Sequence, residues 1–170
     1  MTGPLTSRVH EIDDLRSAIE FCYDQGWTDG LPVVPPTVER VQEFLRVVGR
    51  QPDEVVFEYL ERSRVVTVEK VAINAVMAGC RPEYFPVVLA LIEAIAAPEF
   101  GIHPLNASTG GAALGFVVNG PIRRRIGMNC QGNVLGPGNR ANSTIGRAVR
   151  LTQINALHYW HGHRYPEGVG

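Results

Sequence analysis

The chain has 170 residues, a formal net charge of −1, 45% hydrophobic residues and 19% charged residues. This composition excludes a disordered chain and a strongly basic nucleic-acid-binding protein. No apolar run reaches the roughly 18 residues of a membrane span, the chain does not begin like a secretory signal peptide, and its three cysteines are widely spaced. We therefore expect one cytoplasmic domain over 1–170, with an N-terminal helix within 1–26 and a histidine-rich tail within 151–170, and with neither nucleic acid nor membrane as partner.

Charge is distributed unevenly along the chain. Residues 1–100 contain 16 acidic and 9 basic residues, whereas residues 101–170 contain seven arginines and one acidic residue. Such an asymmetry accompanies either an anionic ligand or the pairing of the two halves, within the fold or across a homodimer.

The first part of the chain predicts two helices separated by a loop. Apolar spacing indicates a helix over 9–25 that Gly26 ends. Residues 27–36 contain three prolines and predict a loop, because proline disrupts helix interiors and central strands. Thr37 is then a suitable N-cap for a second helix that ends at Gly49.

The middle of the chain predicts strands followed by buried helices. Residues 54–68 are rich in Val, Phe and Tyr and indicate one or two strands. Thr67 is a suitable N-cap for a helix over 68–77 closed by Gly79, and the next helix, over 82–96, is apolar on all sides.

The last third predicts a buried strand over 112–119, a short basic helix opened by Pro121 and a final helix over 144–159. Together these elements predict an α+β fold in which helices pack on a small mixed sheet.

The region 119–147, rich in asparagine, glycine and arginine, is the strongest candidate for a binding site. Its loop leads into the final helix, whose N-terminus favours an anion, and two of its arginines can grip a carboxylate or phosphate through paired N–H groups. A loop held by asparagine side-chain turns, or a protein interface, explains the same residues. The candidate substrate-binding residues here are Asn119, Asn139, Arg140, Asn142, Thr144 and Arg147.

Cys80 is the candidate nucleophile. It directly precedes the predicted helix at 82–96, and a helix N-terminus together with the neighbouring Arg81 favours a thiolate. The alternative is a small buried side chain, which is a common place for a free cysteine. Cys130 lies in the asparagine-rich region and could meet Cys80 in a site.

The helix at 68–77 carries a stripe of functional candidates at three- to four-residue spacing, Glu69, Lys70, Asn74 and Met77, which could face a site. Glu69 and Lys70 are acid/base candidates, although ordinary surface charge explains Lys70 and a favourable interaction with the helix dipole explains Glu69. Asn74 is a substrate-binding candidate, because a polar group on an apolar helix needs a partner. His103 is a further acid/base candidate, since imidazole titrates near neutral pH.

Three histidines near the end of the chain, His158, His161 and His163, have a spacing that can reach one metal ion. A transition metal is the one cofactor that the sequence suggests. Terminal aromatic packing or an interface explains the same segment.

Four sequence strings carry a resemblance to a known family. They are WTDGLPVVPPT at 27–37, VEKVAINAVMAGC at 68–80, VNGP at 118–121 and GPGNRAN at 136–142. Over about residues 20–150 they resemble a family of largely uncharacterised bacterial proteins, often found with proteins that carry a selenocysteine- or cysteine-Gly-Ser-Cys motif.

This resemblance implies that the loop containing Asp29, the helix from Glu69 to Cys80 and the asparagine-rich loop form one functional unit, with a thiol-bearing partner subunit. Asp29 thereby joins the candidate substrate-binding residues. The histidine-rich tail and Cys130 depart from the family pattern, and longer members continue past the last helix. We therefore expect a second chain to complete the site.

These observations favour a subunit of a two-component enzyme that acts on a small anionic organic substrate. The expected chemistry is a lyase or hydrolase reaction at a carbon–heteroatom bond, with Cys80 as nucleophile or as a group that holds the reacting centre. The alternatives are a metal-dependent enzyme that uses the C-terminal histidines and a non-catalytic binding or assembly subunit. The expected partner is a companion subunit or a second copy of the chain.

Overall fold

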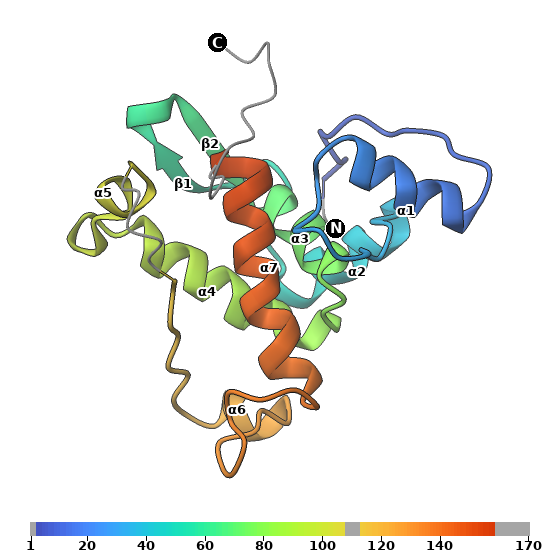
Figure 1. Ribbon diagram of the computed structural model, residues 1–170. Coiled ribbons are helices and arrows are strands. Elements are labelled where there is room, and N and C mark those ends of the chain that lie inside the picture. Colours follow the sequence, from blue (N-terminus) through green and yellow to red (C-terminus); the bar gives the residue numbers. More distant parts are fainter. Residues whose placement is uncertain (1–2, 108–112, 159–170) are drawn as a thin grey trace.

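The computed structural model describes residues 3–107 and 113–158 and confirms an α+β protein that is mostly helical. Helices α3 (Val68–Met77) and α7 (Arg140–Leu157) pack against each other at the centre, and α4 (Phe85–Ala96) and α2 (Val38–Val48) pack on them (Figure 1). The remaining elements are α1 (Leu15–Asp24), β1 (Val55–Tyr59), β2 (Arg64–Thr67), α5 (Ile102–Ala107), α6 (Ile122–Arg125) and short 3-10 helices at Leu60–Arg62, Pro82–Tyr84 and Pro98–Phe100.

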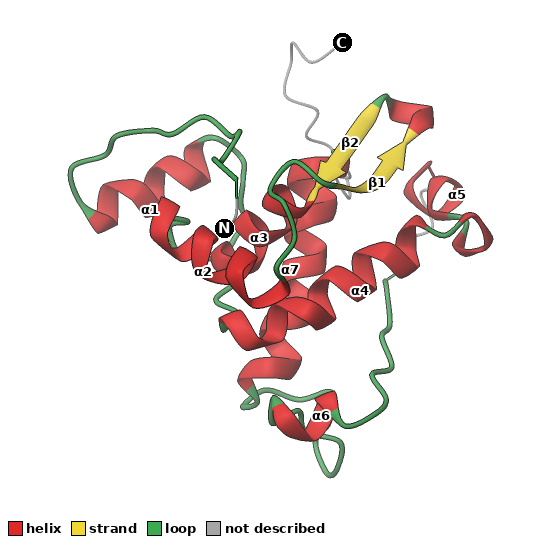
Figure 2. Ribbon diagram, turned by 180° about the vertical axis from the view of Figure 1, so that it is seen from behind, coloured by secondary structure: helices red, strands yellow, loops and turns green. Residues whose placement is uncertain are grey.

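The two strands form an antiparallel hairpin at one end of the molecule (Figure 2). Its ladder runs from the pair Val55 and Thr67 to the pair Tyr59 and Arg64. In the part of the chain that the structure describes, the sheet is this single pair. The expected mixed sheet is therefore wrong, because the segment predicted as a further strand does not pair with the hairpin.

Local signals placed the central helices correctly. The Oγ1 atoms of Thr37 and Thr67 cap α2 and α3, each accepting a backbone N–H three residues later. Gly79, at φ 84°, reverses the chain after α3, where the N–H of Cys80 donates to the carbonyl of Ala75 at 3.0 Å. Glycine suits this left-handed conformation because it has no Cβ.

Unrecognised caps explain why the predicted starts of α1 and α7 are wrong. α1 begins at Leu15 and not near residue 9, because the Asp14 carboxylate accepts the N–H groups of Arg16 and Ser17. α7 begins at Arg140 and not at residue 144, because the Asn139 side chain caps it. In both places a short polar side chain competes for the backbone and fixes the helix end.

The buried strand expected over 112–119 is also wrong in its described part, residues 113–119. This segment is extended but belongs to no sheet, and its residues alternate between exposed and partly buried. Figure 1 shows it, in gold, running past α4 toward α6.

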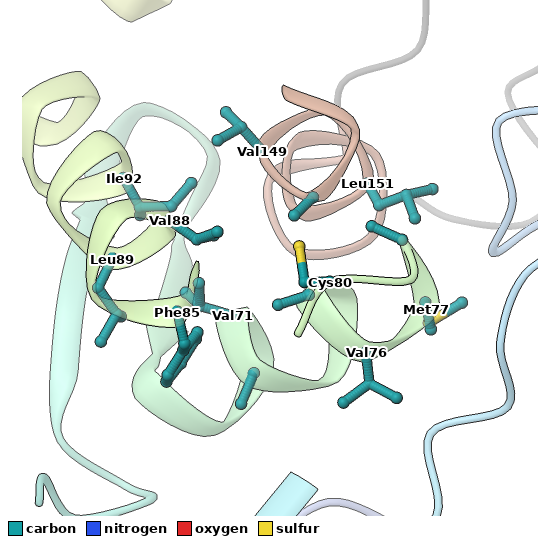
Figure 3. Close-up of a cluster of buried hydrophobic side chains, with 14 of the residues drawn as sticks. Val71, Val76, Met77, Cys80, Phe85, Val88, Leu89, Ile92, Val149 and Leu151 are labelled. Carbon is teal, nitrogen blue, oxygen red and sulfur yellow. The ribbon is translucent and has the colours of Figure 1, made fainter. Parts of the chain in front are cut away.

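The core lies between α3, α4 and α7, where Val71, Phe85, Val88 and Leu151 are fully buried (Figure 3). Within residues 3–107 and 113–158, no single helix is long and apolar enough to cross a membrane. Only the helical stretches Pro82–Ala96 and Pro98–Leu105 reach that length and composition together, as a pair bent by 73°.

Candidate functional site

A cavity of about 620 Å³ lies between α1, α2, α3, α7 and the N-terminal arm, by which we mean residues 3–14. The stripe predicted on α3 faces it, since Glu69, Lys70, Asn74 and Met77 all line its wall. The other walls are largely apolar and include Leu5, Ile12, Phe21, Trp27, Val41 and Ile73. The cavity is therefore the place where the arm meets the predicted stripe.

Three aromatic rings form one side of the cavity. The rings of His10 and Phe21 lie 5.0 Å apart between centroids, and Trp27 lies 5.7 Å from Phe21 at an interplanar angle of 81°. Such tilted and edge-to-face contacts are the favoured arrangements of aromatic side chains. The cluster presents flat apolar surface to the cavity.

Glu69 ties the N-terminal arm to α3. Its side chain is 0% exposed, and its two oxygens accept the Thr6 N–H at 2.8 Å, the Thr6 hydroxyl at 2.7 Å and the Ser7 N–H at 2.9 Å. Burial raises the pKa of the Glu69 carboxyl, but these donors stabilise the anion more strongly and hold the pKa below its ordinary value. Glu69 is therefore an ionised anchor, and this environment does not suit a proton-transfer group.

A chain of amide contacts crosses the floor of the cavity. Asn74 donates to the carbonyl of Lys70 at 2.8 Å, and Asn155 donates to Asn74 Oδ1 at 2.7 Å and to the carbonyl of Trp27 at 3.0 Å. Asn155 Oδ1 is buried and accepts no hydrogen bond from the residues that the structure describes. Sequence reasoning missed Asn155, although, like Asn74, it is a polar residue on a largely buried helix.

Two exposed cations, Arg8 on the arm and Lys70 on α3, also line the cavity. Lys70 Nζ donates to the carbonyl of Val65 at 2.7 Å, which leaves two of its three N–H groups available. One exposed carboxylate, Glu39, lines the cavity as well. The exposed charged side chains that line the cavity are therefore two cations and one anion.

Arg140 and Arg147, the predicted anion clamp, instead hold parts of this chain. The Nε and Nη2 atoms of Arg140 donate to the carbonyl of Gly79 at 3.0 and 2.9 Å. This carbonyl lies just past the end of α3, where a cation is favourable.

Arg147 and Asp29 form a bidentate ion pair with two N–O distances of 2.9 Å. Arg147 also donates to the carbonyls of Leu31 and Pro32, so it locks the proline-rich loop onto α7. Burial raises the pKa of Asp29, and Arg147 outweighs this effect and holds that pKa below its ordinary value. The two residues are brought together as predicted for one unit, but they neutralise each other.

The asparagine-rich loop is held by its own side chains. Asn142 accepts the N–H of Asn129 at 3.1 Å and donates to its carbonyl at 2.9 Å, while Asn139 donates to the carbonyl of Gly127 at 2.8 Å. Thr144 donates to the carbonyl of Arg140 at 2.8 Å. Asn119 is exposed and lies outside this network. The structure thus corresponds to the alternative of a loop ordered by side-chain turns.

Cys80 is a buried thiol, 6% exposed, among the core side chains (Figure 3). Its Sγ lies 3.4 Å from the carbonyl of Thr144. Burial raises its pKa to about 11, against smaller lowering effects of Thr144 and Arg140. The 3-10 helix Pro82–Tyr84 separates it from α4, so it does not occupy the N-terminus of a long helix. These surroundings oppose the predicted role as a thiolate nucleophile.

We expect Cys80 to resist alkylation in the folded protein near neutral pH, because it is buried and its thiolate is scarce. Cys130 is exposed and should react with iodoacetamide within minutes. Peptide mass spectrometry gives the extent of modification at each cysteine, and in denaturant all should react alike. Modification of Cys80 as fast as Cys130 in the folded protein would contradict this description.

His103 and His158 do not line the cavity. His103 shares a hydrogen bond of 2.8 Å with the Tyr59 hydroxyl beside the hairpin. His158 ends α7, and burial followed by the charges of Arg64, Arg62 and Lys70 lowers its pKa. The other two predicted metal ligands, His161 and His163, lie outside the described residues, and no group of three candidate ligands occurs inside them.

Comparison with protein-family models, with curated proteins and with solved structures gives no match to this chain.

Proposed function

We propose that this chain is the substrate-binding subunit of an enzyme complex and that it takes a small organic anion with an apolar body into the cavity beneath the N-terminal arm. The observation that carries this proposal is the cavity itself, about 620 Å³ and largely apolar, with a few polar groups on its wall. Cavities of roughly 300–1,000 Å³ with this lining are the usual sites for small ligands.

The lining indicates the chemistry of the ligand. The rings of Phe21 and Trp27 favour a flat or aromatic body, and Arg8 and Lys70 favour a carboxylate, sulfonate or phosphate on the same molecule. Among the described residues Asn155 Oδ1 is a buried acceptor without a donor, a state that costs about 1–3 kcal/mol. A ligand N–H or O–H that reaches this side chain would remove that cost.

The reacting group of the complex is expected on a companion subunit. Cys80, the thiol predicted to react, is buried and protonated, and Glu69 is occupied by the arm. A companion with its own thiol, as the resembled family implies, would supply the missing nucleophile. Cleavage of a carbon–heteroatom bond by a lyase or hydrolase stays the predicted reaction.

Binding can be tested with 8-anilinonaphthalene-1-sulfonate, which combines aromatic rings, an N–H donor and an anionic group. Its fluorescence should rise saturably at one site per chain. Ile73→Trp, which fills the cavity from α3, should weaken binding by about tenfold or more, because the new side chain excludes the probe. Lys70→Gln should weaken binding less and reduce its dependence on salt.

Val47→Trp is the matched control, since Val47 lies on α2, is 48% exposed and does not line the cavity. It should bind the probe like the unmodified chain. Circular dichroism and thermal unfolding check that both tryptophan variants remain folded. Equal affinity in folded Ile73→Trp and in the unmodified chain would refute the site.

The enzymatic part of the proposal is tested by adding the thiol-bearing companion. Organic anions in a metabolite extract are followed by mass spectrometry with each subunit alone and with both. Consumption of one anion should need both subunits and should fall with Ile73→Trp but not with Val47→Trp. Turnover by the companion alone, indifferent to Ile73→Trp, would remove this chain from the catalytic unit.

A further inference from the structure

The segment 113–119 is extended (Figure 1) and pairs with no strand among the described residues. It contains no proline, so each of its seven residues carries a backbone N–H and a carbonyl, and none of them forms a hydrogen bond within the described part of the chain. A backbone in this state is a ready template for pairing with another strand. The segment lies along the outside of the helical body, where a second strand has access (Figures 1 and 2).

The side chains of the segment follow a strand pattern. Leu114, Phe116 and Val118 are partly buried against the core, whereas Gly115 and Val117 are exposed, the latter to 85%. Two paired strands are marginal by themselves, but packing of one face on a helical body stabilises them. One face of this segment already has that support.

The segment lacks the features that keep an edge strand from pairing. No Asp, Glu, Lys or Arg occurs from residue 100 to residue 122, and no proline lies within 113–119. Proteins usually protect solvent-exposed strand edges with charges, proline or bulges. In addition, Arg123 Nε, just after the segment, is buried without a hydrogen-bond partner among the described residues. Both observations fit a surface that is covered in the assembled protein.

We propose that a second copy of this chain covers the segment, with the two 113–119 segments paired antiparallel about a two-fold axis at Phe116. Leu114 of one copy then lies opposite Val118 of the other, so that the partly buried apolar faces of both copies stay on the same side. A pairing displaced by one residue would place these faces on opposite sides.

Charge selects the antiparallel direction. The exposed Arg124 and Arg125 follow the segment. Antiparallel pairing keeps the arginines of the two copies at opposite ends of the pair, whereas parallel pairing would bring the arginines of both copies together. The resulting contact is isologous, as expected of a two-fold dimer.

The register predicts which positions face each other across the pair. Gly115 of one copy lies opposite Val117 of the other, and both positions are exposed in the single chain. A Cβ at Gly115 would meet nothing within 4 Å, so side chains are tolerated there. The double variant Gly115→Asp with Val117→Asp therefore places four carboxylates together in the dimer while leaving the single chain folded.

Light scattering after size exclusion should give the mass of two chains for the unmodified protein and of one chain for the double aspartate variant. The corresponding double lysine variant, Gly115→Lys with Val117→Lys, should also be monomeric. An equimolar mixture of the two should recover the mass of two chains, because each aspartate then faces a lysine. Val47→Asp, an exposed change on α2, should leave the dimer intact.

A monomeric unmodified protein at micromolar to millimolar concentration would overturn the proposal, as would an aspartate variant that remains dimeric. Failure of the mixture to recover the dimer would overturn the antiparallel register at Phe116. Binding of the 8-anilinonaphthalene-1-sulfonate probe should be the same in all of these variants, so the outcome is independent of the cavity.

Discussion

Glu69→Ala is expected to lower the free energy of unfolding by about 3 kcal/mol and to release the N-terminal arm. The substitution leaves the two N–H groups and the hydroxyl that Thr6 and Ser7 now donate to the carboxylate without their acceptor. Urea unfolding measures the loss of stability, and the rate of tryptic cleavage after Arg8 measures release of the arm.

Glu20→Ala, on the exposed side of α1, is the matched control and should change stability by less than about 0.5 kcal/mol. The loss of stability in Glu69→Gln should lie between the losses in Glu69→Ala and Glu20→Ala. The amide keeps one accepting oxygen but offers an N–H₂ where a second acceptor is needed. An alanine variant as stable and as protease-resistant as the unmodified chain would show that the arm is held by other contacts.

The same carboxylate predicts a stability change in acid. Since the pKa of Glu69 is lower in the folded protein than its ordinary value of 4.5, its contribution is fully present above that value and is lost as pH falls through the folded pKa. The arm should therefore become sensitive to pepsin as pH falls below about 4.5. In Glu69→Ala this part of the pH dependence should disappear.

Arg147→Ala should lower the free energy of unfolding by about 2–4 kcal/mol, because it leaves the carboxylate of Asp29 without its partner in a site where the two side chains are only 18–21% exposed. It also removes the donors to the carbonyls of Leu31 and Pro32. The proline-rich loop should then loosen from α7, which hydrogen exchange would detect at the amides of that loop.

A double-mutant cycle with Asp29→Ala separates the ion pair from the carbonyl contacts. We expect a coupling energy of about 1–2 kcal/mol between the two positions, with the rest of the Arg147→Ala effect unchanged in the Asp29→Ala background. Arg124→Ala, an exposed arginine of α6, should have little effect. Additive losses at Asp29 and Arg147 would mean that the paired geometry contributes nothing to stability.

The parts of the fold that could be predicted from the sequence depend on neighbours in the chain. Thr37 and Thr67 cap helices through residues only three positions away, and the α3 stripe follows from the helical repeat. The contacts that complete the candidate site join distant residues, 63 positions apart for Thr6 and Glu69 and 118 for Asp29 and Arg147. No local pattern encodes such pairs.

The predicted roles of two site residues differ from their surroundings in the structure, because residue type was considered without tertiary contacts. Arg140 was interpreted as a ligand for an anion, but it serves the carbonyl of Gly79 beyond the end of α3. Cys80 was interpreted as a thiolate from its position before a helix, yet burial decides its protonation. Burial and partner choice are tertiary properties, so residue type and spacing alone could not supply them.

Because the cavity has a wall on the arm and a wall on α3, its occupant and the docking of the arm are thermodynamically linked. A ligand that contacts both walls favours the docked arm by the free energy of its own binding, and the effect grows with its concentration. By the same reciprocity, a protein that bound the arm around Thr6 would weaken the binding of such a ligand. If the proposed ligand occupies this cavity, the carboxylate of Glu69 would set how readily that ligand gives way to a protein that binds the arm.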